Sequence, residues 1–176
     1  MSIEPDTKNW TWVLERPCPE CRFDAATVVP GDVPDRLRAT TGVWSQVLRR
    51  DDAQDRPRPS VWSPLEYACH VRDVLRLFDE RLRLMLDGDD PLFADWDQDA
   101  TAVALRYGEQ DPARVTEEVA AAGEQLAGRF AGVGMTVWSR TSRRSDGAHF
   151  TVASFAAYLL HDLEHHEVDV RPGSTR

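Results

Sequence analysis

The sequence predicts an all-α protein, an antiparallel four-helix bundle, and three observations support this fold class. Apolar residues recur at steps of three and four along four long segments, as on the buried face of a helix. Helix-start signals precede two of these segments, and glycine follows two of them. Strand signals are scarce along the chain. Helices of this length joined by loops are typical of a bundle.

We expect the four helices at residues 33–50, 64–87, 112–131 and 151–171. The second has the clearest boundaries, because Ser63-Pro64-Leu65-Glu66 is a capping box with proline in the first turn. The third begins with a similar signal, Asp111-Pro112. The first half of the fourth, residues 152–160, is apolar nearly all round, which predicts a central position. A short helix is expected over residues 99–107.

The length of 176 residues suits one domain with a hydrophobic core. Residues 1–32 are expected to form an extended N-terminal segment, packed on the domain through Trp10 and Trp12. Residues 33–170 then form the helical bundle, and residues 171–176 a C-terminal tail. Helix two places Tyr67 and Val74 on its apolar face, on either side of His70.

The composition limits the classes of partner. The net charge is −9 and the pI is near 5.0, which argues against nucleic-acid binding and against attachment to anionic membranes. No apolar run approaches the roughly 18 residues of a membrane span, and the N-terminus has no secretory signal. We therefore expect a cytoplasmic protein that binds a small-molecule substrate. Three cysteines do not make a disulfide framework.

The predicted functional site is a metal centre formed by three histidines. The fourth helix contains His161 and His165, which are four residues apart and so lie on one face. His70 is the candidate third ligand, because it lies on the flank of an apolar face near the start of helix two. If the second and fourth helices run antiparallel, His70 lies beside the pair. Three imidazoles suit zinc, nickel, iron or copper rather than magnesium or calcium.

Three protein ligands leave an open coordination position, which is the pattern of catalytic rather than structural sites. A metal there would lower the pKa of bound water, or of a thiol, and so generate a nucleophile at neutral pH. Glu164 lies near His161 and His165 on the helix surface and is a candidate general base. The alternative interpretation of Glu164 is a solvated carboxylate.

Other interpretations of the histidines remain open. His70 could be a hydrogen-bonded core residue, and His165 and His166 could be surface residues. His166 points about 100 degrees away from His165, so it is left out of the ligand set. His149 falls in an expected loop and is not counted as a ligand.

The second candidate is a pair of cysteines, Cys18-Pro19-Glu20-Cys21. A zinc ribbon would need a second such pair, and Cys69 is the only other cysteine. A thioredoxin-like redox site would need a βαβ context, which is missing. A reduced cysteine pair without a function is the favoured interpretation, and metal binding with help from elsewhere is the alternative. Cys69 itself is expected at the boundary of its helix, towards solvent.

Two motifs together resemble a known family. Trp62-Ser63-Pro64-Leu65-Glu66-Tyr67-Ala68-Cys69-His70 is similar to the helix-two motif of the DinB-like metal-binding four-helix family, and His161-Asp162-Leu163-Glu164-His165 is similar to its final-helix motif. The family includes the bacillithiol and mycothiol S-transferases and the N-terminal domain of mycothiol-dependent maleylpyruvate isomerase. The resemblance implies a DinB-like bundle with zinc or nickel at the three histidines. Some members use a low-molecular-weight thiol as cosubstrate, so the resemblance implies that this chain could use one too.

Three hypotheses about function follow. The first is a metal-dependent enzyme, a thiol S-transferase or a hydrolase, that activates a small thiol or water for transfer. The second is a non-catalytic protein that binds a metal or small ligand in a stress response. The third is a metal-free helical homodimer. In many family members Arg-Gly-Gln or a similar run follows the last matched histidine, whereas this chain has His166-Glu167-Val168-Asp169. This difference bears on the identity of the substrate rather than on metal binding.

Overall fold

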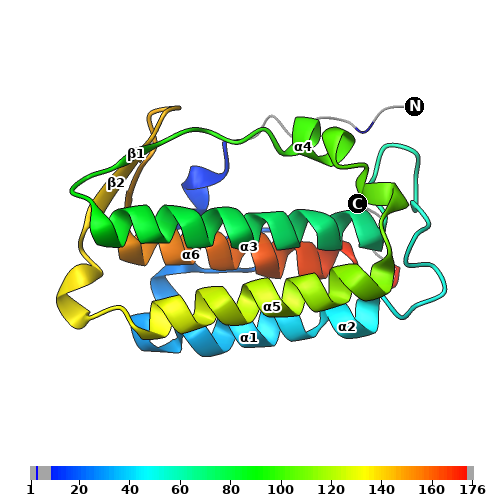
Figure 1. Ribbon diagram of the computed structural model, residues 1–176, viewed down its shortest axis with the longest axis horizontal. Coiled ribbons are helices and arrows are strands. Elements are labelled where there is room, and N and C mark those ends of the chain that lie inside the picture. Colours follow the sequence, from blue (N-terminus) through cyan, green and yellow to red (C-terminus); the bar gives the residue numbers. More distant parts are fainter. Residues whose placement is uncertain (1–2, 4–8, 174–176) are drawn as a thin grey trace.

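Four long helices form a bundle in the computed structural model, which describes residue 3 and residues 9–173 (Figure 1). They are α1 (Val33–Gly42), α3 (Pro64–Asp87), α5 (Pro112–Ala131) and α6 (Val152–Asp169). A single turn, α2 (Trp44–Val47), continues α1. The expected helix over residues 33–50 is thus interrupted at Val43, just after a glycine, which is a poor helix former.

The helices do not all run antiparallel to their neighbours. In Figure 1, α3 and α5 run in one direction, and α1 and α6 run in the other. Helix α3 contacts both α5 and α6, and α1 contacts the same two helices. The pairs α3–α6 and α1–α5 are therefore antiparallel, whereas α3–α5 and α1–α6 are parallel. The cause is the connection over residues 88–111, which includes α4 (Gln98–Ala104) and returns the chain along the bundle before α5 begins.

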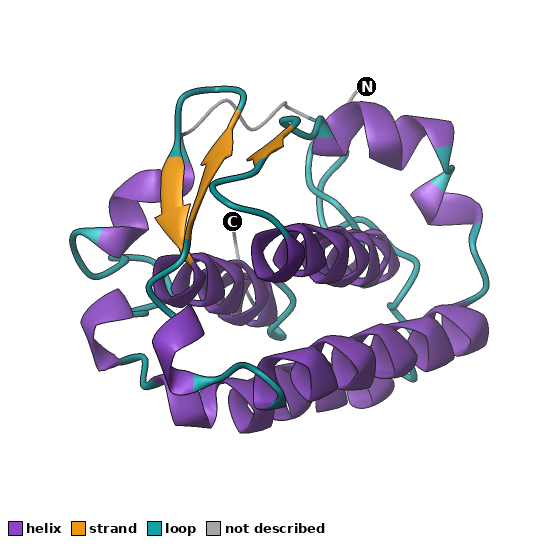
Figure 2. Ribbon diagram, turned by 60° about the vertical axis from the view of Figure 1, so that its left-hand side comes forward, coloured by secondary structure: helices purple, strands orange, loops and turns teal. Residues whose placement is uncertain are grey.

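A small sheet lies at one end of the bundle, so the expectation of a purely helical protein needs correction (Figure 2). Strand β2 (Thr141–Arg144) pairs parallel with β1 (Leu92–Phe93) and antiparallel with β3 (His149–Thr151). Gly147, with φ of +93°, lies in the turn between β2 and β3, where a left-handed conformation favours glycine. Strands of two to four residues are too short to show alternation, which is why this region was expected to be a loop.

The helix starts lie where the capping signals predicted them. The Ser63 hydroxyl accepts a hydrogen bond from the Glu66 N–H, and the Glu66 carboxylate accepts one from the Ser63 N–H. The Asp111 carboxylate caps α5 by accepting from the Arg114 N–H. Each side chain satisfies a backbone N–H that has no partner within the helix.

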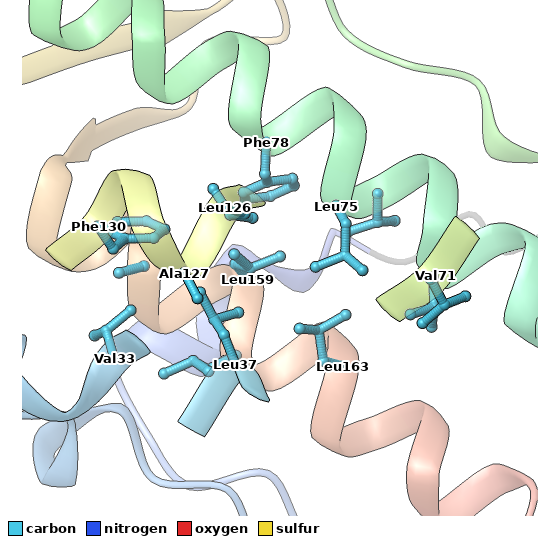
Figure 3. Packing of buried hydrophobic residues seen from close by; sticks show 14 of the residues in the cluster. Val33, Leu37, Val71, Leu75, Phe78, Leu126, Ala127, Phe130, Leu159 and Leu163 are labelled. Atoms are coloured by element: carbon cyan, nitrogen blue, oxygen red, sulfur yellow. The ribbon is translucent and has the colours of Figure 1, made fainter. Parts of the chain in front are cut away.

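The core lies between the four helices, and each of them contributes side chains to it (Figure 3). Leu37, Leu75, Leu126 and Leu159, one from each helix, are fully buried. The ring of Phe78 on α3 stacks on Phe155 of α6 with centroids 4.4 Å apart. The first half of α6 is buried nearly all round, as its apolar composition predicted.

Before α1 the chain forms three short 3-10 helices, η1 (Trp10–Leu14), η2 (Ala25–Thr27) and η3 (Pro30–Asp32). Both η1 and η2 contact α6. Of the N-terminal residues 1–9 only residues 3 and 9 are described, and of the expected tail over 171–176 the last three residues fall outside the described part. Within the described residues, no helix combines the length and apolarity that a membrane span requires.

Candidate functional site

A cavity of about 850 Å³ lies beside α3 and α6, and four of the five histidines line it. Its other walls come from the loop before α3, from the connection between β1 and α4, and from η1. The four histidines are His70, His161, His165 and His166. The fifth, His149, is exposed in β3. The two helix motifs of the sequence therefore meet at one place in the fold.

The structure divides the candidate metal ligands between two groups, in each of which the ligand atoms lie within 4.8 Å of one another. The first group, here the His–Asp–His site, consists of His70, Asp162 and His166. The second group, here the Cys–His site, consists of Cys18, Cys21, His161 and His165. His70 is thus grouped with His166, which sequence reasoning left out, and not with His161 and His165.

The rotation of α6 about its axis explains this division. Residues 162 and 166 form an i, i+4 pair like residues 161 and 165, turned by about 100 degrees. Asp162 and His166 face His70 on α3, whereas the other pair faces the N-terminal segment. The ring of Trp10 on η1 lies 5.4 Å from that of His161 and 5.0 Å from that of His165.

The donor atoms of the His–Asp–His site converge. His70 Nε2 lies 3.5 Å and His166 Nε2 3.3 Å from the same oxygen, Asp162 Oδ1. Two atoms that share one ion at about 2.1 Å are themselves roughly 3.0–3.4 Å apart, so these separations fit a common ion. His70 is almost fully buried, and its Nδ1 has no hydrogen-bond partner among the described residues. The nitrogen that would bind the ion is Nε2, which faces Asp162, so the unpartnered Nδ1 lies on the other side of the ring.

A further carboxylate orients His166. Its Nδ1 lies 2.9 Å from Asp169 Oδ2, so the ring can donate its Nδ1 proton to Asp169 and keep the Nε2 lone pair free. Histidines that bind metals commonly have such a partner on the second nitrogen. In the metal-free protein, burial lowers the pKa of His166, but the charges of Asp162 and Asp169 outweigh it and raise the pKa to about 10. A metal ion at Nε2 would therefore take the place of a proton.

Aromatic rings enclose the two imidazoles. The ring of His70 lies between Trp62, at 5.3 Å, and Trp96, at 5.6 Å, and the ring of His166 packs against Tyr67 at 5.1 Å. This accounts for the Trp-Ser motif, because Ser63 caps α3 while its neighbour Trp62 packs on the histidine. These ring contacts restrict rotation of the imidazoles.

The structure gives Glu164 and Glu66 structural partners. Glu164 accepts two hydrogen bonds from Arg36 and does not line the cavity, so its placement does not support the role of general base. Glu66 is paired with Arg56 and with the Ser63 N–H, as its capping role predicted. Cys69 was expected near solvent but is fully buried, with its sulfur 3.8 Å from the Tyr107 carbonyl oxygen.

Arginines contribute positive charge to the cavity wall. Arg81 is buried and donates a hydrogen bond to the Ala94 carbonyl oxygen. Burial, and then the neighbouring charge of Arg144, lower the pKa of Arg81 to about 10. Arg144 itself is neutralised by two hydrogen bonds to Asp146. Among the described residues Arg81 has no carboxylate in an ion pair, so it can receive an anionic group.

A comparison with models of protein families tests the family membership that the two motifs suggested. The sequence profile of the DinB superfamily matches residues 34–167, which include α3, α5, nearly all of α1 and most of α6. The chain belongs to the DinB superfamily. A search of curated proteins gives no match. A similar solved structure is YfiT from Bacillus subtilis, described as a probable metal-dependent hydrolase with an unusual four-helix bundle topology.

The likeness to YfiT concerns the fold. The TM-score is 0.70 at 16% sequence identity, and the match covers 80% of this chain and 85% of YfiT. In this DinB-superfamily chain the expected His-x-x-x-His pair is present, but Asp162-x-x-x-His166 is the pair that meets His70. Sequence reasoning missed this because it took His161 and His165 as the pair that faces His70, and it left out His166 because that residue is turned about 100 degrees from His165.

Proposed function

We propose that this protein is a metal-dependent enzyme of the hydrolase or thiol-transferase type and that His70, Asp162 and His166 hold its metal ion. The observation that carries the proposal is the convergence of two imidazole nitrogens on one Asp162 oxygen in the wall of an 850 Å³ cavity. The description of YfiT as a probable metal-dependent hydrolase supports the same class of activity.

The donor set fits a divalent metal such as zinc or nickel, since it combines two imidazoles with one carboxylate. Such an ion, with positions left open towards the cavity, would acidify water or a small thiol and so supply a nucleophile at neutral pH. The chain itself sets the geometry: Asp169 holds the Nδ1 proton of His166, and Asp162 presents one oxygen to both rings. Trp62 and Trp96 hold the plane of His70.

The cavity indicates the kind of substrate. Its volume is typical of sites for small molecules. Trp62, Trp96 and Tyr158 offer apolar surface, and Arg81 offers a positive charge that no ion pair among the described residues neutralises. We therefore propose a small, partly apolar substrate with an anionic group. Replacing Arg81 by Gln is expected to raise KM for such a substrate more than it lowers kcat.

The proposal is tested by metal content and turnover in protein purified without a histidine tag. Hydrolysis of an activated ester and conjugation of a thiol to an electrophile are measured separately, to distinguish water from thiol as the nucleophile. The variant His166→Ala is expected to lose one metal per chain and the activity. His149→Ala replaces an exposed histidine and is expected to retain both.

Other outcomes identify the alternatives. A His166→Ala protein that keeps its activity, together with an inactive His161→Ala protein, would favour the three-histidine set over the His–Asp–His site. A protein that binds the metal but turns over neither class of substrate would favour the non-catalytic binding function.

A further inference from the structure

We propose that Cys18, Cys21, His161 and His165 bind one zinc ion in a closed structural site, distinct from the His–Asp–His site. The inference does not rest on the proposed enzymatic function. Its four ligands come from two segments with the spacings Cys-x-x-Cys and His-x-x-x-His. These spacings occur in structural zinc sites with two cysteines and two histidines. The second pair that the cysteines lacked in the sequence is therefore a pair of histidines.

The ligand atoms are already gathered in one place. All four lie within 4.8 Å of one another, and Cys18 Sγ is 3.8 Å from His165 Nδ1. A tetrahedral zinc with Zn–S near 2.3 Å and Zn–N near 2.05 Å separates sulfur from nitrogen by roughly 3.6 Å. His161 Nε2 is buried and has no hydrogen-bond partner among the described residues. A zinc ion would satisfy this nitrogen.

The backbone around the cysteines forms a turn that gathers their sulfurs. The Cys18 N–H donates to the Phe23 carbonyl oxygen, and the Arg22 N–H donates to the Cys18 carbonyl oxygen, both at 2.8 Å. Arg22 has φ of +66°, a left-handed conformation that is uncommon for a residue with a side chain. The backbone N–H of Phe23 is hydrogen-bonded to the Cys21 sulfur. Burial outweighs this hydrogen bond and raises the pKa of the Cys21 thiol to about 11, so a metal ion that binds here would displace a proton.

The surroundings of His165 resemble those of a metal ligand. Its Nδ1 faces the sulfur of Cys18, and its Nε2 lies 3.6 Å from Glu20 Oε2 and 3.9 Å from Asp169 Oδ2. A carboxylate on the second nitrogen fixes the orientation of a coordinating imidazole. Glu20 lies between the two cysteines in the sequence, so one short segment provides two ligands and a carboxylate that orients a third.

Four protein ligands and their cover distinguish this site from a catalytic one. Cys18 is 1% exposed, His161 4% and His165 7%, whereas Cys21 is half-buried, and the rings of Trp10 and Phe23 pack on the imidazoles. Four protein ligands leave zinc no open position for a substrate. These features indicate a structural role.

The site would attach the N-terminal segment to the second half of α6. Trp10 and Glu20 belong to that segment and also line the cavity. A zinc ion at the Cys–His site would therefore fix one wall of the cavity in place. The Cys–His site offers soft thiolate ligands together with imidazole nitrogens, whereas the neighbouring site offers nitrogen and oxygen only.

The experiment uses cobalt(II) as a spectroscopic substitute for zinc in the full-length, untagged, reduced protein. Cobalt bound to thiolates shows an intense charge-transfer band in the near ultraviolet, which imidazole and carboxylate ligands do not produce. We expect one equivalent of cobalt to give this band in the wild-type protein, and one equivalent of zinc to abolish it. A wild-type protein that shows no such band would overturn the proposal, whatever the variants do.

Variants assign the band to residues and separate the two sites. Cys21→Ser and His161→Ala are expected to weaken or abolish the band, whereas Cys69→Ala, which removes a buried cysteine elsewhere, is expected to keep it. His166→Ala should also keep the band while losing the proposed activity, so failure of one proposal is distinguishable from failure of the other. A Cys18–Cys21 disulfide in freshly purified, zinc-free protein would also contradict the zinc site.

Discussion

The two ligand groups on α6 share one helix and alternate along it, yet they face different surroundings. The Cys–His site faces the N-terminal segment, is covered by aromatic rings and has four protein ligands. The His–Asp–His site faces α3 and has three, and histidines of both sites line the cavity. The outer residues of the His–Asp–His site are partly exposed, with 25% of the Asp162 side chain and 16% of the His166 side chain accessible.

If both proposals hold, the number of ligands and the covering segment, rather than the residue types alone, separate the structural from the catalytic metal site. His165 and His166, which are adjacent in the sequence, belong to different ligand groups because the helix turns about 100 degrees per residue. Asp169 contacts both His165 and His166, so the two sites are adjacent but not identical in chemistry. Four predictions test this contrast.

The largest effect is expected from removing zinc from the Cys–His site. A ligand present at about a thousand times its Kd stabilises the folded state by about 4 kcal/mol. For a protein of this size that corresponds to a fall in Tm of about 8–16 °C when zinc is removed. Calorimetry with zinc and with a chelator measures the difference. Cys21→Ser should lose most of this zinc dependence and Cys69→Ala should keep it; equal dependence in both variants would contradict the contrast.

The second prediction concerns the carboxylates of the His–Asp–His site. Asp162→Asn keeps the shape of the side chain but removes the charge that binds the ion, so activity is expected to fall by more than about 100-fold. Asp169→Asn changes only the partner of His166, and a fall of about 10- to 100-fold is expected. Steady-state kinetics at saturating metal give both values. If Asp169→Asn were the more damaging of the two, Asp162 would not be the ligand.

The third prediction is that the metal-free sites respond to pH in opposite directions. The pKa of His161 is lowered to about 4, mainly by burial, so its contribution to stability is present above about pH 6.5 and is lost as the pH falls towards 4. The pKa of His166 is raised to about 10, because Asp162 and Asp169 outweigh burial. Its contribution is present below about pH 6.5 and is lost as the pH rises towards 10. Imidazole NMR signals should show both titrations; two ordinary titrations near pH 6.5 would remove the contrast.

The smallest effect is expected for Glu164→Gln. Glu164 lies between the two sites in the sequence but contacts Arg36, and both side chains are over a quarter exposed. The variant is expected to lose about 0.2–1 kcal/mol of stability, as partly exposed ion pairs usually do, and to keep its activity within about twofold. Chemical denaturation and the kinetic assay measure these quantities. A loss of activity much larger than this would restore Glu164 as a general base.

The sequence predicted the helices and their starts well, because those signals are local. Ser63 and Asp111 cap the helices they were expected to cap. The short strands were missed because their pairing depends on segments far apart, such as Leu92 opposite Arg143. The direction of α5 was also missed, since nothing in the periodicity of a helix specifies which way the chain enters it.

For the candidate site, the sequence indicated the region but not the grouping of its residues. His161 and His165 do form a pair on one face, yet which pair of α6 faces α3 depends on how the whole helix packs. Leu159 and Leu163 are both fully buried, so the core fixes the rotation of α6. The histidines that lie beside Cys18 are more than 140 residues away along the chain, with Cys18 and His165 separated by 147 positions. No spacing rule joins residues so distant.

The parallel arrangement of α3 and α5 has a consequence for how this protein can diversify. In a bundle of hairpins the chain would turn back at the end of α3, far from the middle of the helix. Here the stretch over residues 88–111 travels back along the bundle, and on the way it brings Trp96 onto the ring of His70. One wall of the cavity is thus formed by a connecting segment that contributes none of the candidate metal ligands. Changes of length or sequence there can alter which molecules fit while the ion-binding residues stay as they are.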